Sequence, residues 1–408
     1  MKYLAATPIL IIFIFTTSVT LHGQVSAIDS LKSVLRNGVS TTSEVNTLNK
    51  LAVAYLINEE CDSGLYYSVR SVKMADSLNY KKGKALATFY TGLSLRCKQD
   101  YANAYKSLLE AKNLFEELGN EKYVAKCLKD IGIILLYQDN KADALRIFFL
   151  ALNTSEKIKD TTEIMTVLIE ISDLFYFEKN YKKALEYAKR DETYAYSQPL
   201  IHPREVVTEQ LGYIYISLNN DSLALKYQLE SLRLSAMQKD TFGIANSYLQ
   251  LGYYYYDSKN NNELALQYLQ KAEKMYAVVK DSSGISNSHL GQARVYRSTG
   301  NAVLALISFK KSLHFAELTH DNYAIADNCL EIGQTLFEAG RYAEALSYFK
   351  DNLEVSNHIK QATRIAIAYK ELGNVYEKLK KPNEALIYLN KFIILQDSIN
   401  AKMQEDKL

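Results

Sequence analysis

Small residues recur along this chain at intervals of 40 residues, with a single step of 41 in each of two series. The first series consists of Ala52, Gly92, Gly132, Ser172, Gly212, Gly252, Ala293, Gly333 and Gly373. The second series lies 12 or 13 residues later and consists of Gly64, Ala104, Ala144, Ala184, Ala224, Ala265, Ala305, Ala345 and Ala385. A constant period of this length indicates an array of repeats, in which each unit covers the apolar face of its neighbour. We call the members of the two series the first and the second small position of a repeat.

Turn-forming residues separate the two small positions of each repeat, as in residues 138–140 and 298–301. Each repeat is therefore expected to consist of two antiparallel helices, one on either side of the turn. A glycine inside a helix costs about 1 kcal/mol relative to alanine, so we infer that the small positions let the two helices touch. The sequence predicts an all-α solenoid of about nine antiparallel helix pairs over residues 43–400.

The residues around the small positions follow a shared pattern. It occurs at Leu211, Gly212, Tyr215, Ala224, Leu225 and Tyr227, and again at Leu372, Gly373, Tyr376, Ala385, Leu386 and Tyr388. This pattern resembles the tetratricopeptide repeat family. The resemblance spans roughly residues 45 to 400 and implies a right-handed superhelical solenoid. The family's basic unit has about 34 residues and closes its second helix with a proline. The longer unit without that proline resembles repeats of bacterial regulatory and envelope proteins, and it implies longer second helices.

The composition suits uninterrupted helices. The 408 residues include 32 tyrosines, no tryptophan and only 4 prolines, and proline is the residue that interrupts helices most strongly. The formal net charge is +2, and no stripe of basic residues stands out. Nucleic acid is therefore not an expected partner.

The N-terminus has the organisation of a secretory signal peptide, which we predict over residues 1–27. Lys2 supplies a basic start, residues 8–19 are mostly apolar, and polar or small residues follow. The apolar core is shorter than the roughly 20 residues that span a bilayer. Cleavage is expected after Gln24 or Ala27, so that membrane contact is limited to the signal before cleavage. An uncleaved membrane anchor is the alternative.

Three further segments differ from the regular repeats. Residues 28–42 are predicted to form a capping helix and a linker, and residues 401–408 an extension of the last helix. Pro199 and Pro203 fall in the connection between the fourth and fifth repeats, and neither can lie in a helix interior. This connection is either a rigid loop or a hinge between two parts of the array.

The four cysteines show neither metal-binding spacing nor a Cys-x-x-Cys pair. Cys61 and Cys97 fall near the ends of first helices in adjacent repeats, so they can form a disulfide in an oxidising compartment. The alternative is the more common state of an isolated cysteine, a small buried apolar residue with a free thiol. Spacing by itself does not decide between the two.

No catalytic motif is present, and no cofactor or metal is expected. The sequence has no glycine-rich phosphate loop, no His-Glu-x-x-His and no nucleophile elbow. The six histidines are scattered without metal-ligand spacing: His22, His202, His289, His314, His320 and His358. We therefore expect a protein that is not an enzyme.

The family resemblance predicts a binding surface on the first helices, which line the concave groove in tetratricopeptide arrays. It implies that the residues one and four positions after the first small position point into this groove. These residues are Val53, Leu56, Leu93, Arg96, Ile133, Leu136, Asp173, Tyr176, Tyr213, Ile216, Tyr253, Tyr256, Arg294, Arg297, Gln334, Phe337, Asn374 and Glu377. They are mostly aliphatic in the early repeats, tyrosine in the middle and arginine in the seventh repeat.

Tyrosine and arginine supply most hot spots of protein interfaces. The predicted ligand-binding residues are therefore Tyr176, Tyr213, Tyr253, Tyr256, Arg294 and Arg297. The alternative is that some of these side chains pack between repeats.

The function predicted from these features is that of a non-catalytic scaffold of the bacterial cell envelope, periplasmic or secreted, that binds a protein or peptide through its groove. A second hypothesis is a sensory input module of a two-component or transcription-regulatory system whose output domain lies outside this chain. A cytoplasmic regulator that binds peptide pheromones is a third class, against which the apolar N-terminus argues. Neither the ligand nor the oligomeric state follows from the sequence.

Overall fold

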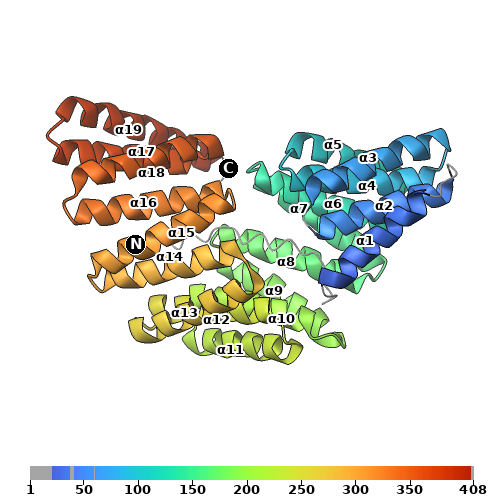
Figure 1. Ribbon diagram of the computed structural model, residues 1–408, viewed down its shortest axis with the longest axis horizontal. Helices are drawn as coiled ribbons and strands as arrows, with labels where there is room; N and C mark the ends of the chain where they lie inside the picture. The colour runs from blue at the N-terminus through green and yellow to red at the C-terminus, as the bar shows by residue number, and fades with distance from the viewer. Residues whose placement is uncertain (1–20, 37–40, 59, 406–408) are drawn as a thin grey trace. The chain divides into compact units, whose positions relative to one another are not determined.

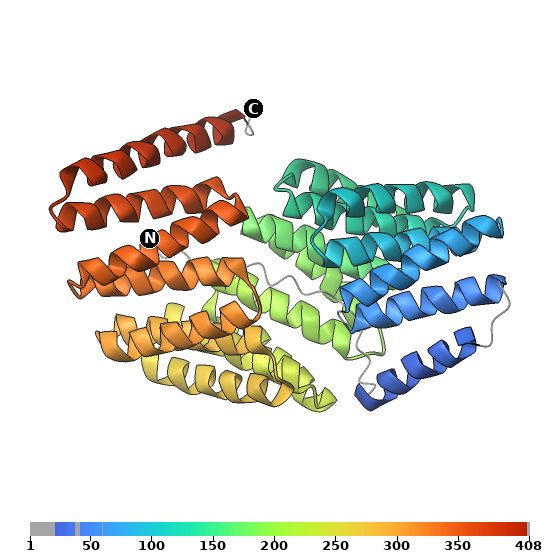
Figure 2. The same ribbon diagram turned by 45° about the horizontal axis from the view of Figure 1, so that its top comes forward.

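The computed structural model describes residues 21–36, 41–58 and 60–405, and all of its regular elements are α-helices. The chain divides at Pro199 into two compact units. The helices of the N-terminal unit are α1 (Leu21–Arg36), α2 (Thr42–Ile57), α3 (Cys61–Ser77), α4 (Lys81–Cys97), α5 (Tyr101–Glu117), α6 (Glu121–Tyr137), α7 (Lys141–Lys157), α8 (Thr161–Phe177) and α9 (Tyr181–Ser197). Within this unit, consecutive helices lie side by side (Figures 1 and 2).

The C-terminal unit continues the same alternation. Its helices are α10 (His202–Ser217), α11 (Asp221–Gln238), α12 (Thr241–Asp257), α13 (Asn262–Val279), α14 (Ser282–Ser298), α15 (Ala302–Leu318), α16 (Asn322–Glu338), α17 (Tyr342–Ile359), α18 (Ala362–Lys378) and α19 (Pro382–Glu405). Helices α2 to α19 form the predicted helix pairs, with even-numbered helices first and odd-numbered helices second in each repeat. The prediction of an all-α array of paired helices is confirmed.

The extra residues of the long repeat are not confined to the second helices. Apart from α19, which has 24 residues, the second helices have 17 or 18 residues and the first helices 16 or 17. Asparagine and aspartate define many of the boundaries, because their side chains accept hydrogen bonds from the first free backbone N–H groups of a helix. Asn180 and Asn220, for example, cap α9 and α11 in this way.

The small positions bring the two helices of a repeat into contact, as their periodicity predicts. A Cβ atom added to Gly132 would lie 2.5 Å from Phe148, and one added to Gly333 would lie 2.5 Å from Phe349. Both phenylalanines stand four residues after the second small position and are fully buried. Larger residues at the first small position can face smaller partners, since Ser172 pairs in register with Ala188. The Ser172 hydroxyl donates to the backbone oxygen of Ala184 at 2.9 Å.

Helix α1 packs against the first repeat. Ile28 is buried against Leu51 and Tyr55, and Leu31 and Leu35 are partly buried in the same cluster. The helix begins at Leu21, before the capping helix expected from Ile28. Residues 1–20 of the predicted signal peptide lie outside the described residues, so the signal peptide stays a prediction. Among the described helices, none combines the length and the apolar character needed to cross a membrane.

The proline-containing connection coincides with the boundary between the two units. Helix α9 ends at Ser197 and α10 begins at His202, so Pro199 lies between helices. Pro203 occupies the first turn of α10, where a missing N–H costs no hydrogen bond. The prolines thus separate two arrays without interrupting a helix.

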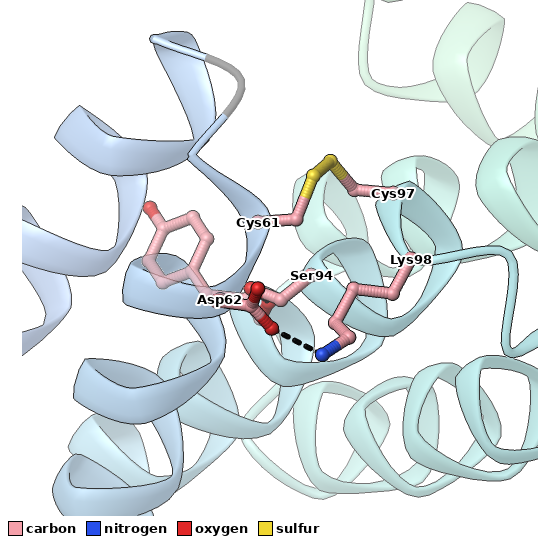
Figure 3. Close-up of a disulfide and its surroundings, with 6 residues drawn as sticks. Cys61, Asp62, Ser94, Cys97 and Lys98 are labelled. Atoms are coloured by element: carbon pink, nitrogen blue, oxygen red, sulfur yellow. Dashed lines mark hydrogen bonds and ion pairs between the residues drawn. A yellow bond between two sulfur atoms is a disulfide. The ribbon is translucent and has the colours of Figure 1, made fainter. Parts of the chain in front are cut away.

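A disulfide joins the first repeat to the second. Cys61 and Cys97 have Cα atoms 5.8 Å apart, which is within the usual range for a disulfide. Figure 3 shows the bond together with the ion pair between Asp62 and Lys98, which lies next to it. Cys97 ends the first helix α4, as expected, but Cys61 opens the second helix α3 and does not end a first helix. The bond therefore fixes the turn of one repeat to the end of its neighbour's first helix.

We expect Gly333→Ser to lower the free energy of unfolding by about 1–3 kcal/mol, because the added atoms overlap the ring of Phe349. The double variant Gly333→Ser/Phe349→Ala reproduces the pair Ser172 and Ala188 of the fourth repeat. Urea denaturation of the two single variants and the double variant should give a double-variant loss smaller than the sum of the single losses. Strictly additive losses would show that the two side chains do not share one contact.

We expect Cys61→Ser/Cys97→Ser to be less stable than the wild type by up to about 4 kcal/mol, the chain-entropy value for a loop of this length. The sequence separation is 36 residues. Thermal unfolding with and without a reducing agent measures the effect. The reductant should lower the melting temperature of the wild type and leave that of the double variant unchanged.

Candidate functional site

Three of the six predicted binding residues belong to one polar cluster in the C-terminal unit. Arg294 and Arg297 on α14 both reach Glu331 on α16. Arg294 Nε and Nη2 lie 3.0 and 2.9 Å from Glu331 Oε1, and Arg297 Nη1 lies 2.6 Å from Glu331 Oε2. Tyr253 on α12 is the third member, close enough to influence the charge of Arg294. One carboxylate thus holds two guanidinium groups of the preceding repeat.

Burial affects the members of this cluster differently. Burial opposes the charge of Arg294, but Glu331 and Tyr253 outweigh it, so that the pKa of Arg294 is raised. Burial also raises the pKa of Tyr253, whose hydroxyl donates to the backbone oxygen of Asn287 at 3.0 Å. The side chain of Arg294 is 14% exposed and that of Arg297 is 27% exposed. Arg297 is therefore the more accessible of the two cations.

The remaining predicted residues have separate surroundings. Tyr256 is half-buried on α12 and packs against the cluster of apolar residues that includes Leu269 and Tyr276. Tyr213 is half-buried on α10. Tyr176 belongs to the N-terminal unit, where its ring lies 5.5 Å from that of Tyr181 on the second helix of its own repeat. The six residues thus do not form one contact cluster. Several of them pack against other helices of the array, in agreement with the alternative that such side chains pack between repeats.

A ladder of polar contacts links the first helices of neighbouring repeats. In the N-terminal unit, Arg96 Nη1 lies 3.0 Å from Asp130 Oδ1. In the C-terminal unit, Gln334 Nε2 donates to Glu371 Oε1 at 3.3 Å, in the same register as the pair of Arg294 and Glu331. The partner residue in each case stands two positions before the first small position of the next repeat.

Sequence reasoning missed the acceptors of this ladder. The position two residues before the first small position is occupied by Asp130, Glu170, Gln210, Gln250, Glu331 and Glu371 in six of the nine repeats. When this position is compared between repeats at the 40-residue period, its residues are mostly acidic or carry a side-chain amide. The groove residues that the family resemblance implies all stand after the first small position, so these acceptors are not among them.

The N-terminal unit contains acidic groups whose ionisation is disfavoured. The pKa of Glu170 is raised to about 7, mainly by burial and to a smaller extent by the neighbouring Asp173. The same two causes raise the pKa of Asp191 to about 8. Asp191 is 1% exposed, and its Oδ1 atom lacks a hydrogen-bond partner. These carboxyl groups are held in an environment that favours their neutral forms.

The two free cysteines are buried. Burial raises the pKa of the Cys127 thiol, and it raises that of Cys329 to about 12, so both are poor nucleophiles. No group of three potential metal ligands occurs within the described parts of the chain. A surface hollow of about 950 Å³ lies at the turns around Asn120, Lys159 and Gln198, and none of the six predicted residues lines it.

Comparison with known proteins agrees with this geometry. Residues 322–393, which comprise α16, α17, α18 and half of α19, match the tetratricopeptide repeat family. The fold is that of a tetratricopeptide repeat array. The family resemblance inferred from the small positions is confirmed for residues 322–393. No curated protein sequence matches the chain.

Several solved structures share the fold at low sequence identity. The apo form of RapI is similar over 88% of this chain and 98% of its own, with 17% identity and a TM-score of 0.56. A Rap protein complexed with competence and sporulation factor matches over 84% of this chain and all of its own, with 14% identity and a TM-score of 0.54. A signal-transduction ATPase with a tetratricopeptide repeat sensor from Pyrococcus horikoshii matches over 74% of this chain but 47% of its own, with 17% identity and a TM-score of 0.54.

We expect Asp191→Asn to stabilise the protein at pH 8 by about 1.4 kcal/mol or more, the free energy of one pKa unit, because the amide does not ionise whereas the buried carboxyl does. The folded-state pKa of Asp191 lies above its unfolded value of 3.8. The folded state therefore binds the proton more tightly, and stability falls as the pH rises from about 4 to 8. Urea denaturation as a function of pH should show a smaller decline for Asp191→Asn. A stabilisation that is the same at pH 4 and pH 8 would contradict this explanation.

Proposed function

We propose that this tetratricopeptide array is an exported, non-catalytic scaffold of the bacterial cell envelope that binds a protein or peptide along its first helices. The observation that carries the proposal is the partly exposed pair of Tyr256 and Arg297 on the first helices of adjacent repeats. A half-buried tyrosine and arginine combine large apolar area with polar tips, which is the composition of interface hot spots.

The charge balance of the arginine cluster supports binding at this surface. Arg294, Arg297 and Glu331 together carry two positive charges and one negative charge. Arg297 has its charge in a partly desolvated position beside the ring of Phe309, 5.7 Å from the ring centroid. A ligand that reaches Arg297 gains a charge-assisted hydrogen bond in surroundings drier than bulk water.

Two further observations support export and binding. Disulfides persist in oxidising compartments such as the periplasm, and the bond between Cys61 and Cys97 suits such a compartment. A structural neighbour is a Rap protein in complex with competence and sporulation factor. We extend ligand binding, without the identity of that ligand, to the present chain.

The second candidate function is sensory input to a two-component or transcription-regulatory system. The structural similarity to a signalling ATPase whose repeats are described as a sensor favours it. In this case the bound protein is a kinase or regulator, or ligand binding changes the affinity for one. Identification of the partner distinguishes the two candidates, since a scaffold retains an envelope protein and a sensor retains a signalling protein.

We expect Tyr256→Ala/Arg297→Ala to weaken binding of the specific partner by about 2 kcal/mol or more, roughly 30-fold in Kd. The matched control is Tyr66→Ala/Arg146→Ala, which removes the same residue types from exposed positions on the second helices α3 and α7. Tyr253 and Arg294 are left intact because they link neighbouring repeats.

The measurement is affinity purification of the full chain from its own cell envelope, followed by titration with the recovered partner. Helical content should be unchanged in both double variants, and the test variant should stay folded at the binding temperature although it loses the packing of Tyr256 and the ion pair of Arg297 with Glu331. Equal binding by wild type, test variant and control would remove the first helices from consideration as the binding surface.

A further inference from the structure

Helix α19 exposes a face that is covered in every other second helix. From α3 to α17, the residues 4, 7 and 11 positions after the second small position are all buried. The equivalent residues of α19 are Leu389, Phe392 and Gln396, and all three are only half-buried. In α17 the same register holds Phe349, Asn352 and Ser356. Within the described residues, α19 is therefore less covered than the other second helices.

A separate stripe on another side of α19 is apolar and exposed, and it is formed by Leu386, Ile387, Ile393 and Ile394. Leu386 is 60% exposed, whereas the residue in its register is half-buried in all eight preceding repeats. Ile393 is 53% exposed, and Ile387 and Ile394 are 53% and 72% exposed. Ile387 and Ile394 stand 2 and 9 positions after the second small position, in registers that are exposed from α3 to α17 and hold mostly polar residues there. The apolar stripe of α19 thus indicates an association surface.

The order of residues on α19 identifies the occupant. The segment Leu386-Ile387-Tyr388-Leu389-Asn390-Lys391-Phe392-Ile393-Ile394 has similar side chains at equal distances on either side of Asn390. Leu386 corresponds to Ile394, Ile387 to Ile393, and Tyr388 to Phe392. A helix with this symmetry matches an antiparallel copy of itself, because a two-fold axis at Asn390 places each residue opposite its counterpart.

The charges are self-complementary in the same arrangement. Asp397 is exposed near the C-terminal end of the stripe, and the exposed Lys380 and Lys381 precede the helix. An antiparallel pairing brings Asp397 of one copy to the basic N-terminal end of the other. The helix dipoles are opposed as well, and the N-terminal end of a helix attracts negative charge. The two Asn390 side chains meet at the axis, where each amide can donate to and accept from the other.

We propose that the chain forms a two-fold symmetric dimer through antiparallel contact between the α19 helices of two copies. The contact covers the apolar stripe formed by Leu386, Ile387, Ile393 and Ile394. This surface is separate from the first-helix residues proposed to bind a ligand, so the dimer does not depend on the proposed function.

Size-exclusion chromatography with light scattering on the full chain should give twice the mass of one chain. We expect Ile387→Glu to shift the protein to the monomer, because the dimer places a carboxylate against Ile393 of the other copy. The matched control is Ile307→Glu on α15, which occupies the same register of its repeat and is 48% exposed. The control should remain dimeric. A monomeric wild type, or a dimer that survives Ile387→Glu, overturns the proposal.

Cysteine cross-linking tests the antiparallel geometry separately. Asn390→Cys should give a covalent dimer on mild oxidation, since the two thiols meet at the axis. Ser398→Cys is also exposed, but its symmetry mate lies about 24 Å away along the helix at 1.5 Å per residue, so it should not cross-link. The native free thiols, Cys127 and Cys329, are buried and do not interfere. Cross-linking at Ser398→Cys that equals or exceeds that at Asn390→Cys would contradict an antiparallel contact.

Discussion

The close approach of the two helices within a repeat is the contact on which the array depends. At Gly132 and Gly333 the partner is a phenylalanine ring so close that no Cβ atom fits. The ring is fully buried in both cases, so the missing side chain on one helix becomes packing volume for the other. Glycine weakens an isolated helix, but here the loss is offset by dispersion and burial of a large ring. Helix stability in this chain thus comes mainly from packing.

The packing of the two helices in a repeat also determines where the residues next to the first small position lie. This is why polar contacts between first helices recur in one register, as with Arg96 and Asp130 in one unit and Arg294 and Glu331 in the other. Such contacts set the spacing of neighbouring repeats, and they also occupy side chains that face a potential ligand. A ligand at this surface must therefore use the atoms that the ladder leaves accessible. Arg297, which is more exposed than Arg294, satisfies this condition.

Most of the fold could be predicted because its determinants are periodic. Ala293 follows Gly252 by 41 residues where the other steps are 40. The surrounding residues still identify the register, and the helices follow it. The sequence does not decide the disulfide, because spacing along the chain does not show that the start of α3 approaches the end of α4. Glu331 was missed because a glutamate on a helix is ordinarily solvated. Its role depends on two arginines that lie 37 and 34 residues earlier in the sequence and approach it only in the folded array.

Folding and association use different residues of α19. In a repeat array the contact between successive repeats is generic, since each unit presents the same register of buried positions to the next. An apolar stripe that lies outside this register and is exposed is stabilised when another molecule covers it. In α19, Leu386 and Ile393 keep the apolar character of interior repeats, and the sequence around Asn390 is symmetric along the helix. An exposed and self-complementary surface favours a second copy of the chain over an unrelated helix. Each contact between the two copies then occurs twice, once on either side of the two-fold axis.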